Sequence, residues 1–242
     1  NSGRALINPV QISAGPEHNC ALDDHGVLCW ENGSYGQTNV FYSLKNPTQI
    51  APGSNHTCAL DDTGVVCWGD GRKRQVNKTR WGATKTELTN PTAIFSGGHQ
   101  SCAVDDGALK CWGDVGMSGQ DNPTSVSLGT YHGCSAGAAG VLCGYTSAAQ
   151  DNSAYRQGQT DVPSLSNPVE VAVGSTHTCA LDDTGVVCWG SNSQGQTDIP
   201  ALSDPIQISA GSGHTCVLDR VGGLYNDVVC WGYNIYGQID SH

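Results

Sequence analysis

Short stretches of alternating apolar and polar residues recur along the whole chain, and none has the period of a helix. Residues 9–13 place apolar side chains two apart, and residues 177–181 and 186–190 form two further stretches. Asp-Asp-Thr-Gly separates the last two stretches, and its glycine can supply the positive φ of a tight hairpin turn. The pattern therefore predicts three or four short β-strands joined by turns.

This pattern of strands is repeated six times. The segment from Gly174 to Gly190 has copies that begin at Gly15, Gly53, Gly97, Gly129 and Gly211, and the last copy holds an insertion around residues 223–226. Units of about 40 residues with three or four strands are typical of propeller blades. We predict an all-β fold in a single domain over residues 1–242. It is a closed β-propeller of six blades, with seven as the alternative, and residues 5–7 pair beside the last blade.

Composition and charge exclude several other classes of protein. Glycine is abundant, at 32 of 242 residues, charged residues make up only 14%, and there are two Phe and one Met. A helical bundle would need more Ala, Leu, Glu and Lys. No apolar run approaches the length of about 18 residues that would suggest a transmembrane helix, so we predict no membrane insertion. The net charge of −11 argues against nucleic acid as a partner, because binding phosphates needs a basic face.

The 12 cysteines fall into six pairs, one in each unit. The pairs are Cys20–Cys29, Cys58–Cys67, Cys102–Cys111, Cys134–Cys143, Cys179–Cys188 and Cys216–Cys230. Each pair straddles a predicted hairpin turn, at mirrored places on adjacent strands, which is within disulfide reach. Zinc is the alternative, although each unit offers only two thiols and one His. Six disulfides predict an oxidising compartment. Because the chain starts at Asn1 and its only Met is Met117, we expect a secreted protein without its signal peptide, or a trimmed chain.

The repeated motif resembles a known family. Pro-x-x-Ile-x-x-Gly-x-x-His-Thr-Cys-Ala-Leu, followed by Gly-Val-Val-Cys-Trp-Gly-x-Asn-x-x-Gly-Gln, is similar to the repeats of the regulator of chromosome condensation family. The resemblance implies a β-propeller, which in that family most often has seven blades. The chain departs from the nuclear members in its cysteines, its shorter units and its acidic balance, so their nucleotide exchange activity is not expected here. Residues 144–160 carry no full repeat.

Three kinds of recurring residue are expected to stabilise the fold rather than to bind a ligand. They are the six histidines at one repeat position (His18, His56, His99, His132, His177, His214), the Trp after the second Cys (Trp30, Trp68, Trp112, Trp189, Trp231) and the Asp pairs of the hairpins (Asp23-Asp24, Asp61-Asp62, Asp105-Asp106, Asp182-Asp183). We expect the histidines to bond within a blade and the tryptophans to fill the core. The alternative for the Asp pairs is calcium, but each turn supplies few of the oxygens that calcium needs.

The Asn-x-x-Gly-Gln loop at the end of the first, fifth and sixth units is the candidate binding surface. Amides and exposed tyrosines could bind the polar groups and the C–H face of a sugar. The predicted ligand-binding residues are Asn32, Tyr35, Gln37, Asn192, Gln196, Tyr233, Asn234, Tyr236 and Gln238. The competing interpretation is that these residues only build the turn.

A basic segment in the second unit is a candidate patch for a partner. Six of the 11 basic residues lie between residues 72 and 85, and the patch consists of Arg72, Lys73, Arg74, Lys78, Arg80 and Trp81. An anionic glycan or a partner protein could bind it, and a solvated loop is the alternative. Sequons at Asn32, Asn55 and Asn77 are candidate glycosylation sites, although Asn55 lies directly before a strand.

No motif in the sequence supplies a catalytic nucleophile or a phosphate-binding loop. We therefore predict a secreted, non-enzymatic binding protein without a cofactor, lectin-like, which binds glycans through repeated loops. The alternative is a protein-interaction module or inhibitor that uses one propeller face, as in the β-lactamase inhibitors that this architecture resembles. An enzyme is the third possibility, and the sequence does not predict an oligomeric state.

Overall fold

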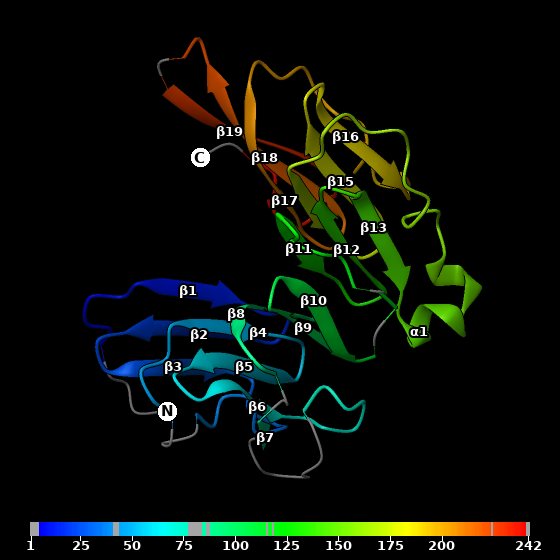
Figure 1. Cartoon of the computed structure of the whole chain (residues 1–242). Helices are drawn as coiled ribbons and strands as arrows, with labels where there is room; N and C mark the ends of the chain where they lie inside the picture. The colour runs from blue at the N-terminus through cyan, green and yellow to red at the C-terminus, as the bar shows by residue number, and fades with distance from the viewer. Residues whose placement is uncertain are drawn as a thin grey trace. The chain divides into compact units, whose positions relative to one another are not determined.

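The computed structural model describes residues 5–40, 44–76, 84–85, 88–114, 116–117, 119–223 and 225–240. These residues form six antiparallel sheets, which we call blades 1 to 6 in chain order (Figure 1). The predicted all-β fold of six propeller blades is confirmed. No helix in the described part of the chain is long and apolar enough to cross a membrane.

Five blades have three strands and blade 2 has a fourth. The strands are β1 (Gln11–Ala14), β2 (His18–Asp23) and β3 (Gly26–Glu31) in blade 1; β4 (Gln49–Pro52), β5 (His56–Asp61), β6 (Gly64–Gly69) and β7 (Thr84–Lys85) in blade 2; β8 (Pro91–Gly97), β9 (Gln100–Asp105) and β10 (Ala108–Gly113) in blade 3; β11 (Ser125–Leu128), β12 (His132–Gly137) and β13 (Gly140–Tyr145) in blade 4; β14 (Glu170–Val173), β15 (His177–Asp182) and β16 (Gly185–Gly190) in blade 5; and β17 (Pro205–Ala210), β18 (His214–Val221) and β19 (Tyr225–Gly232) in blade 6. Two short helices, α1 (Ser147–Gln150) and η1 (Ser153–Tyr155), follow blade 4.

The chain divides into two compact units, residues 1–115 with blades 1 to 3 and residues 116–242 with blades 4 to 6. We describe each unit by itself. A single domain over residues 1–242 and a closed ring both remain predictions. The pairing of residues 5–7 beside the last blade also remains a prediction, and within its own unit Ile7 is bonded to blade 1. Its N–H donates to Asp23 of blade 1 (2.9 Å), and its carbonyl accepts from the N–H of Asp24 (3.1 Å).

The Asp pairs build the hairpin turns, as expected. In blade 2, Asp61 Oδ1 accepts from the N–H and hydroxyl of Thr63, and Asp61 Oδ2 accepts from the N–H of Lys45 (2.8 Å). Asp62 accepts from the side chain of Asn46 (2.6 Å). Gly64 has the positive φ of 110° that the turn requires. In blades 1, 2, 3, 5 and 6, a carboxylate therefore joins the hairpin to the segment that precedes its own blade.

All six predicted disulfides are present, each within one blade. The paired cysteines lie directly opposite each other on the second and third strands, with Cα atoms 4.0–4.1 Å apart. In blade 6 the cysteines are 14 residues apart rather than 9, and the additional residues extend the hairpin beyond them. The register of the hairpin therefore places the cysteines within reach whatever the length of the turn.

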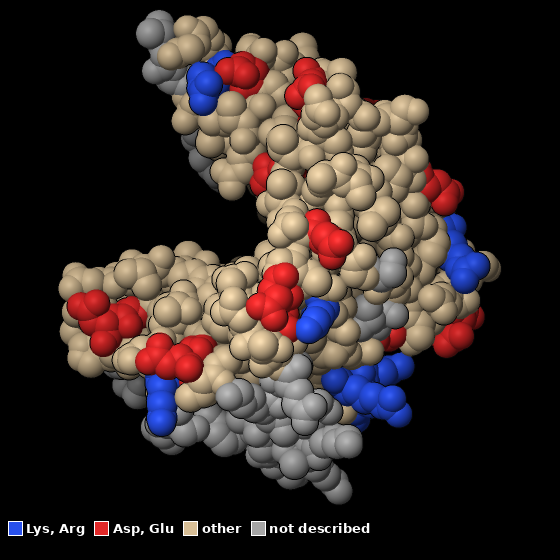
Figure 2. Space-filling model, viewed as in Figure 1, with Lys and Arg blue, Asp and Glu red and all other residues tan. Residues whose placement is uncertain are grey.

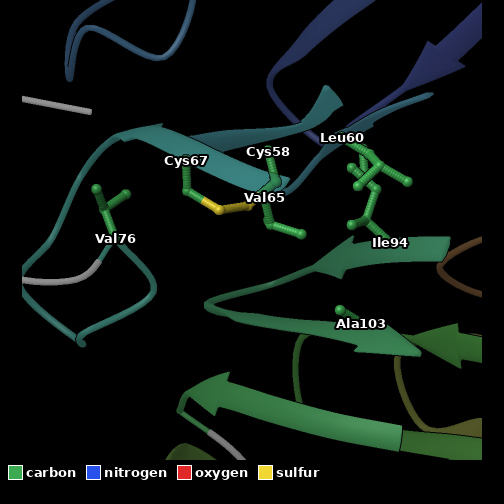
Figure 3. Close-up of a cluster of buried hydrophobic side chains, with 8 residues drawn as sticks. Cys58, Leu60, Val65, Cys67, Val76, Ile94 and Ala103 are labelled. Atoms are coloured by element: carbon green, nitrogen blue, oxygen red, sulfur yellow. A yellow bond between two sulfur atoms is a disulfide. The ribbon is translucent and has the colours of Figure 1, made fainter. Parts of the chain in front are cut away.

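The core of each unit lies between neighbouring blades. Figure 3 shows the cluster at which Leu60 and Val65 of blade 2 pack with Ile94 and Ala103 of blade 3, beside the disulfide of blade 2. Trp68, which is 1% exposed, packs in the same way against the disulfide and Leu22 of blade 1. The prediction that the repeated tryptophans pack in the core is confirmed here, and at Trp189 and Trp231 in the C-terminal unit. Trp30 is half-buried.

A polar bracket also joins the first strands of neighbouring blades. Gln11 of blade 1 accepts from the N–H of Ile50 (2.8 Å) and donates to its carbonyl (2.9 Å), and Gln49 forms the same pair of bonds with Ile94. Blade 5 has Glu170 at this position, which accepts from the N–H of Ile208 (3.1 Å). Burial raises the pKa of Glu170, and the bond from Ile208 partly offsets this effect. An ionised carboxylate cannot supply the second bond of the bracket.

Glu170→Gln is expected to stabilise the folded protein at neutral pH, because the amide can donate to the carbonyl of Ile208 as the other two glutamines do in their brackets. The expected gain in the free energy of unfolding is about 1 kcal/mol. Because the pKa of Glu170 is raised in the folded state, its contribution is complete below its unfolded value of 4.5 and is lost as the pH rises through the folded value. Urea unfolding at about pH 4 and about pH 8 measures both effects.

The matched control is Gln49→Glu, which places a carboxyl group in the equivalent bracket of blade 2. It should lower the stability at neutral pH and introduce a loss of stability on raising the pH, like that of Glu170. Equal stability of Glu170→Gln and the parent chain at both pH values would show that the bracket is not completed.

Candidate functional site: the loop end of the blades

The candidate residues lie at one end of each blade, which we call the loop end. It consists of the loop between the first and second strands and the loop after the third strand. The pairing of His56 with Gly69, and of His177 with Gly190, brings these two loops together, because the second strand begins where the third one ends. The opposite end of each blade carries the hairpin turn, which holds an Asp pair in blades 1, 2, 3 and 5.

The glutamine that ends the loop after the third strand is a structural residue. Gln37 is fully buried and Gln196 is 2% exposed. Their Oε1 atoms accept from the N–H two residues earlier, that of Tyr35 (2.9 Å) and that of Gln194 (2.7 Å). Gln238 closes its turn in the same way, onto the N–H of Tyr236 (2.9 Å). The two buried amides are therefore inside the turn rather than on the surface where a sugar would contact them.

The carbonyl of the same glutamine joins its blade to the next one. At the first interface, the Gln37 carbonyl accepts from the Thr57 hydroxyl (2.8 Å) and the Trp68 indole N–H (2.8 Å) of blade 2. His18 of blade 1 bonds the same hydroxyl through Nε2 (2.7 Å). We call this group of four residues the interblade latch.

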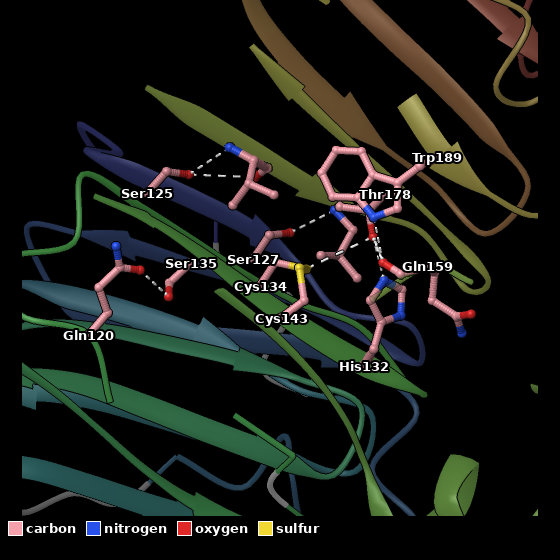
Figure 4. The surroundings of a disulfide bond; sticks show 12 residues. Gln120, Ser125, Ser127, His132, Cys134, Ser135, Cys143, Gln159, Thr178 and Trp189 are labelled. Atoms are coloured by element: carbon pink, nitrogen blue, oxygen red, sulfur yellow. Dashed lines mark hydrogen bonds between the residues drawn. A yellow bond between two sulfur atoms is a disulfide. The ribbon is translucent and has the colours of Figure 1, made fainter. Parts of the chain in front are cut away.

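The latch recurs between blades 4 and 5 (Figure 4). There the Gln159 carbonyl accepts from Thr178 and Trp189, both at 2.9 Å, and His132 bonds Thr178 at 2.7 Å. Between blades 5 and 6 the latch consists of His177, Thr215, Gln196 and Trp231. Between blades 2 and 3 it consists of His56, Ser101, Gln75 and Trp112, and there the Gln75 carbonyl accepts from Trp112 but not from Ser101. The histidines therefore bond between blades rather than within one.

The interpretation of His99 was wrong. The strand position occupied by His18, His56, His132, His177 and His214 belongs in blade 3 to Gln100, the first residue of β9. His99 lies one residue earlier, three rather than two residues before the cysteine.

Burial keeps the latch histidines neutral. Desolvation, followed by the charges of His99 and His18, lowers the pKa of His56 to about 3. Desolvation, followed by the charge of His214, lowers the pKa of His177 to about 4. The hydroxyl of Thr215 already donates to the Gln196 carbonyl, so Nε2 of His177 must carry the hydrogen and donate to that hydroxyl.

The predicted asparagines are bonded inside their own loops. Asn192 donates to Asp198 (2.7 Å) and accepts from the N–H of Thr197 (3.1 Å). Asn234 repeats this arrangement with Asp240 (2.7 Å) and the N–H of Ile239 (3.0 Å). Both asparagines remain exposed, whereas Asn32 is half-buried, donates to Glu17 (3.2 Å) and accepts from the N–H and hydroxyl of Ser34.

The tyrosines are the accessible part of the predicted sugar site. Tyr236 is 83% exposed, and its ring meets that of Tyr233 edge to face, with centroids 6.3 Å apart. Tyr35 is 37% exposed and lies on blade 1, in the other unit.

Three residues of the basic patch are described, and all three are exposed. The Arg72 guanidinium lies 4.7 Å from the centroid of the Tyr35 ring and donates to Asp70. Burial acts to raise the pKa of Asp70, but the bonds from Arg72 bring it below its usual value. Lys73 lies 3.9 Å from Asp114, and Arg74 has a positive φ of 64°. Lys78, Arg80 and Trp81 lie outside the described residues.

Basic groups are unevenly distributed on the visible surface. Figure 2 shows the largest group of Lys and Arg side chains beside the residues that are not described, with acidic side chains scattered over the rest of that face. Among the sequons, Thr57 of the Asn55 site is fully buried in a latch, which opposes modification of the folded chain. Asn32 is accessible, and Asn77 lies outside the described residues.

Sequence reasoning missed an aromatic cluster in blade 4. Tyr131 and Tyr155 stack with ring centroids 4.0 Å apart and planes 9° apart, and the Arg156 guanidinium lies 5.4 Å from the centroid of the Tyr145 ring. The signal available in the sequence was the long gap after Cys143, in which residues 144–160 depart from the repeat.

Comparison with known proteins agrees with this architecture. The profile of the regulator of chromosome condensation (RCC1) repeat matches residues 48–75, 169–196 and 206–238, which lie in blades 2, 5 and 6. Three of the six blades therefore match the RCC1 repeat. Among curated protein sequences, none matches the chain.

Solved structures share the fold of this chain. The CRINKLY WD40 ectodomain of the receptor kinase ACR4 from Arabidopsis thaliana is similar with a TM-score of 0.69 at 21% identity, over 98% of this chain and 83% of that one. Human WBSCR16 is similar with a TM-score of 0.73 at 16% identity, over 98% of this chain and 79% of that one. At these identities the likeness concerns the propeller fold alone.

Acid is expected to weaken the contacts that the latch histidines make between blades. Below about pH 6.5 the unfolded chain binds protons at the latch histidines, whereas burial keeps these histidines neutral in the folded chain. The free energy of unfolding should therefore fall as the pH decreases below about 6.5. Each histidine contributes a slope of up to about 1.4 kcal/mol per pH unit. In His177→Gln, about one proton fewer should be taken up on unfolding, so the slope of the free energy of unfolding against pH should be smaller. Urea unfolding between about pH 4.5 and about pH 6.5 measures this slope. A slope identical to that of the parent chain would contradict this assignment.

Proposed function

We propose that this protein is a non-enzymatic binding module that recognises a partner protein through the loop ends of its blades. The stack of Arg72 on Tyr35, with Lys73 and Arg74 exposed beside it, is the observation that carries the proposal. Tyr and Arg are the side chains most often found at the energetic centres of protein interfaces. The six disulfides support an oxidising, extracellular place of action.

The loops that carry this surface are held in place before any partner arrives. The turn that holds Tyr35 is closed by the buried Gln37 side chain, and the Gln37 carbonyl is bonded to Thr57 and Trp68 of the next blade. Arg72 is fixed by the carboxylate of Asp70 as well as by the ring. Ordered side chains lose little conformational freedom on binding, which favours affinity.

Charge indicates the chemistry of the partner. The side chains of Arg72 and Lys73 are 67% and 53% exposed, whereas those of the acidic groups beside them, Asp70 and Asp114, are only 5% and 4% exposed. The exposed patch therefore offers cations in a chain whose net charge is −11. An acidic segment of a partner protein is the occupant that this surface supports best.

The patch is tested by screening a displayed peptide library against the folded protein and measuring the affinity of the selected peptides. We expect acidic peptides, and we expect the double variant Lys73→Glu and Arg74→Glu to weaken their binding by tenfold or more, or about 1.4 kcal/mol. The matched control is Arg220→Glu, which reverses a cation that is paired with Asp204 in the C-terminal unit. Selection of no peptide, or equal loss in the control, would contradict the proposal.

Carbohydrate binding at blade 6 is the second candidate function. Its support is the pair Tyr233 and Tyr236, because an exposed aromatic face can stack on the C–H side of a sugar ring. The exposed Asn234 and Asp240 lie in the same loop and could bond hydroxyl groups after breaking their mutual bond.

A glycan array and titration calorimetry test this second function. Binding of any glycan should fall at least tenfold in Tyr236→Ala and remain in Tyr35→Ala, since the Tyr35 ring is occupied by Arg72. The Tyr236 side chain is almost free of the core, so the fold should be unchanged in the far-ultraviolet circular dichroism spectrum. If the parent chain binds no glycan on the array, carbohydrate binding is contradicted and recognition of a partner protein is the function that stands.

A further inference from the structure

Blade 4 lacks both of the groups that donate to a glutamine carbonyl in other blades. Gly133 stands where Thr57 and Thr178 lie, directly before the first cysteine, and Gly144 stands where the repeated tryptophan follows the second cysteine. A Cβ atom on Gly144 would lie 1.7 Å from the carbonyl oxygen of Gly116, so the chain has no room for a tryptophan there.

A pair of stacked tyrosines lies at the loop end of this blade. Tyr131 precedes β12, and Tyr155 ends η1 in the insertion 24 positions later. Their rings are nearly parallel, with centroids 4.0 Å apart, and both side chains are half-buried. The stack joins the insertion to the loop between β11 and β12.

We propose that Tyr131 and Tyr155 form an oxidative cross-linking site, at which hydrogen peroxide and a haem peroxidase join the two phenols as dityrosine. Each phenol loses one hydrogen atom to the oxidant and becomes a phenoxyl radical, whose unpaired electron is shared with the carbons ortho to oxygen. Two ortho carbons form a carbon–carbon bond, and the hydrogen atom on each shifts to the phenol oxygen. Two electrons and two protons leave the protein, and one peroxide is reduced to two waters.

The geometry favours this pair over the other tyrosines. Rings that are already in contact convert coupling into an intramolecular step with a high effective concentration. Tyr233 and Tyr236 also lie near each other, but their centroids are 6.3 Å apart and their planes meet at 73°. The Tyr145 ring lies under the Arg156 guanidinium, and its hydroxyl donates to Gln159 (3.3 Å). Burial and then the bond to Tyr155 raise the pKa of Tyr131, so its phenol stays protonated until oxidation.

The experiment uses the whole chain with its disulfides intact. The protein is treated with horseradish peroxidase and hydrogen peroxide, and then digested with a protease that cleaves before aspartate. Cleavage before Asp121, Asp151 and Asp161 separates Tyr131, in residues 121–150, from Tyr155, in residues 151–160. We expect these two peptides to be joined, with a mass lower than their sum by two hydrogen atoms, and to show the blue fluorescence of dityrosine.

Three conservative variants identify the partners. Tyr131→Phe and Tyr155→Phe keep the stacked rings but cannot form dityrosine, so each should abolish the joined peptides. Tyr145→Phe is the matched control, because Tyr145 lies in the same peptide as Tyr131, and it should leave the yield unchanged. Unjoined peptides from the oxidised parent chain, while free tyrosine in the same mixture does couple, would overturn the proposal. A joined pair that persists in Tyr131→Phe would overturn it as well.

Discussion

A hydrogen bond from one blade to the glutamine carbonyl of the blade before it is the interaction on which the rest of each unit depends. At the interfaces after blades 1, 4 and 5, this single oxygen accepts from a threonine hydroxyl and a tryptophan indole of the following blade. Because all three groups are buried, an unmade bond would leave a desolvated polar group at the interface. The latch thus fixes the distance between blades, the site of the tryptophan and the course of the turn.

The disulfides and the latch act at different levels. Each disulfide joins two strands of one blade, and each latch joins two blades. They meet in the core, where Trp68 packs against the disulfide of blade 1 while its N–H reaches the Gln37 carbonyl. The scarcity of Phe and Met in the chain is consistent with this design, because sulfur, indole and small side chains fill the space between sheets.

The proposed binding functions depend on residues that do not take part in the latch. The buried glutamines and the bonded asparagines build the loops, whereas Tyr35, Arg72 and Tyr236 are displayed on them. Repeated residues at the loop end are therefore structural, and residues that occur in only one or two blades are the ones that can distinguish a partner. Blade 4 is the clearest departure, since glycines stand at its two donor positions and a stacked pair of tyrosines lies at its loop end.

The sequence by itself determined the strands, the six blades and the six disulfides, because the period-two pattern, the Asp-Gly turns and the mirrored cysteines are local signals. It could not reveal that the Gln37 carbonyl accepts from Thr57, which lies 20 residues away, or that His18 bonds the same threonine, which lies 39 residues away. The stack of Tyr131 on Tyr155 likewise arises only when the insertion folds back on blade 4. Contacts between blades are non-local, and a motif read along the chain does not distinguish a side chain that faces solvent from one that faces the neighbouring blade.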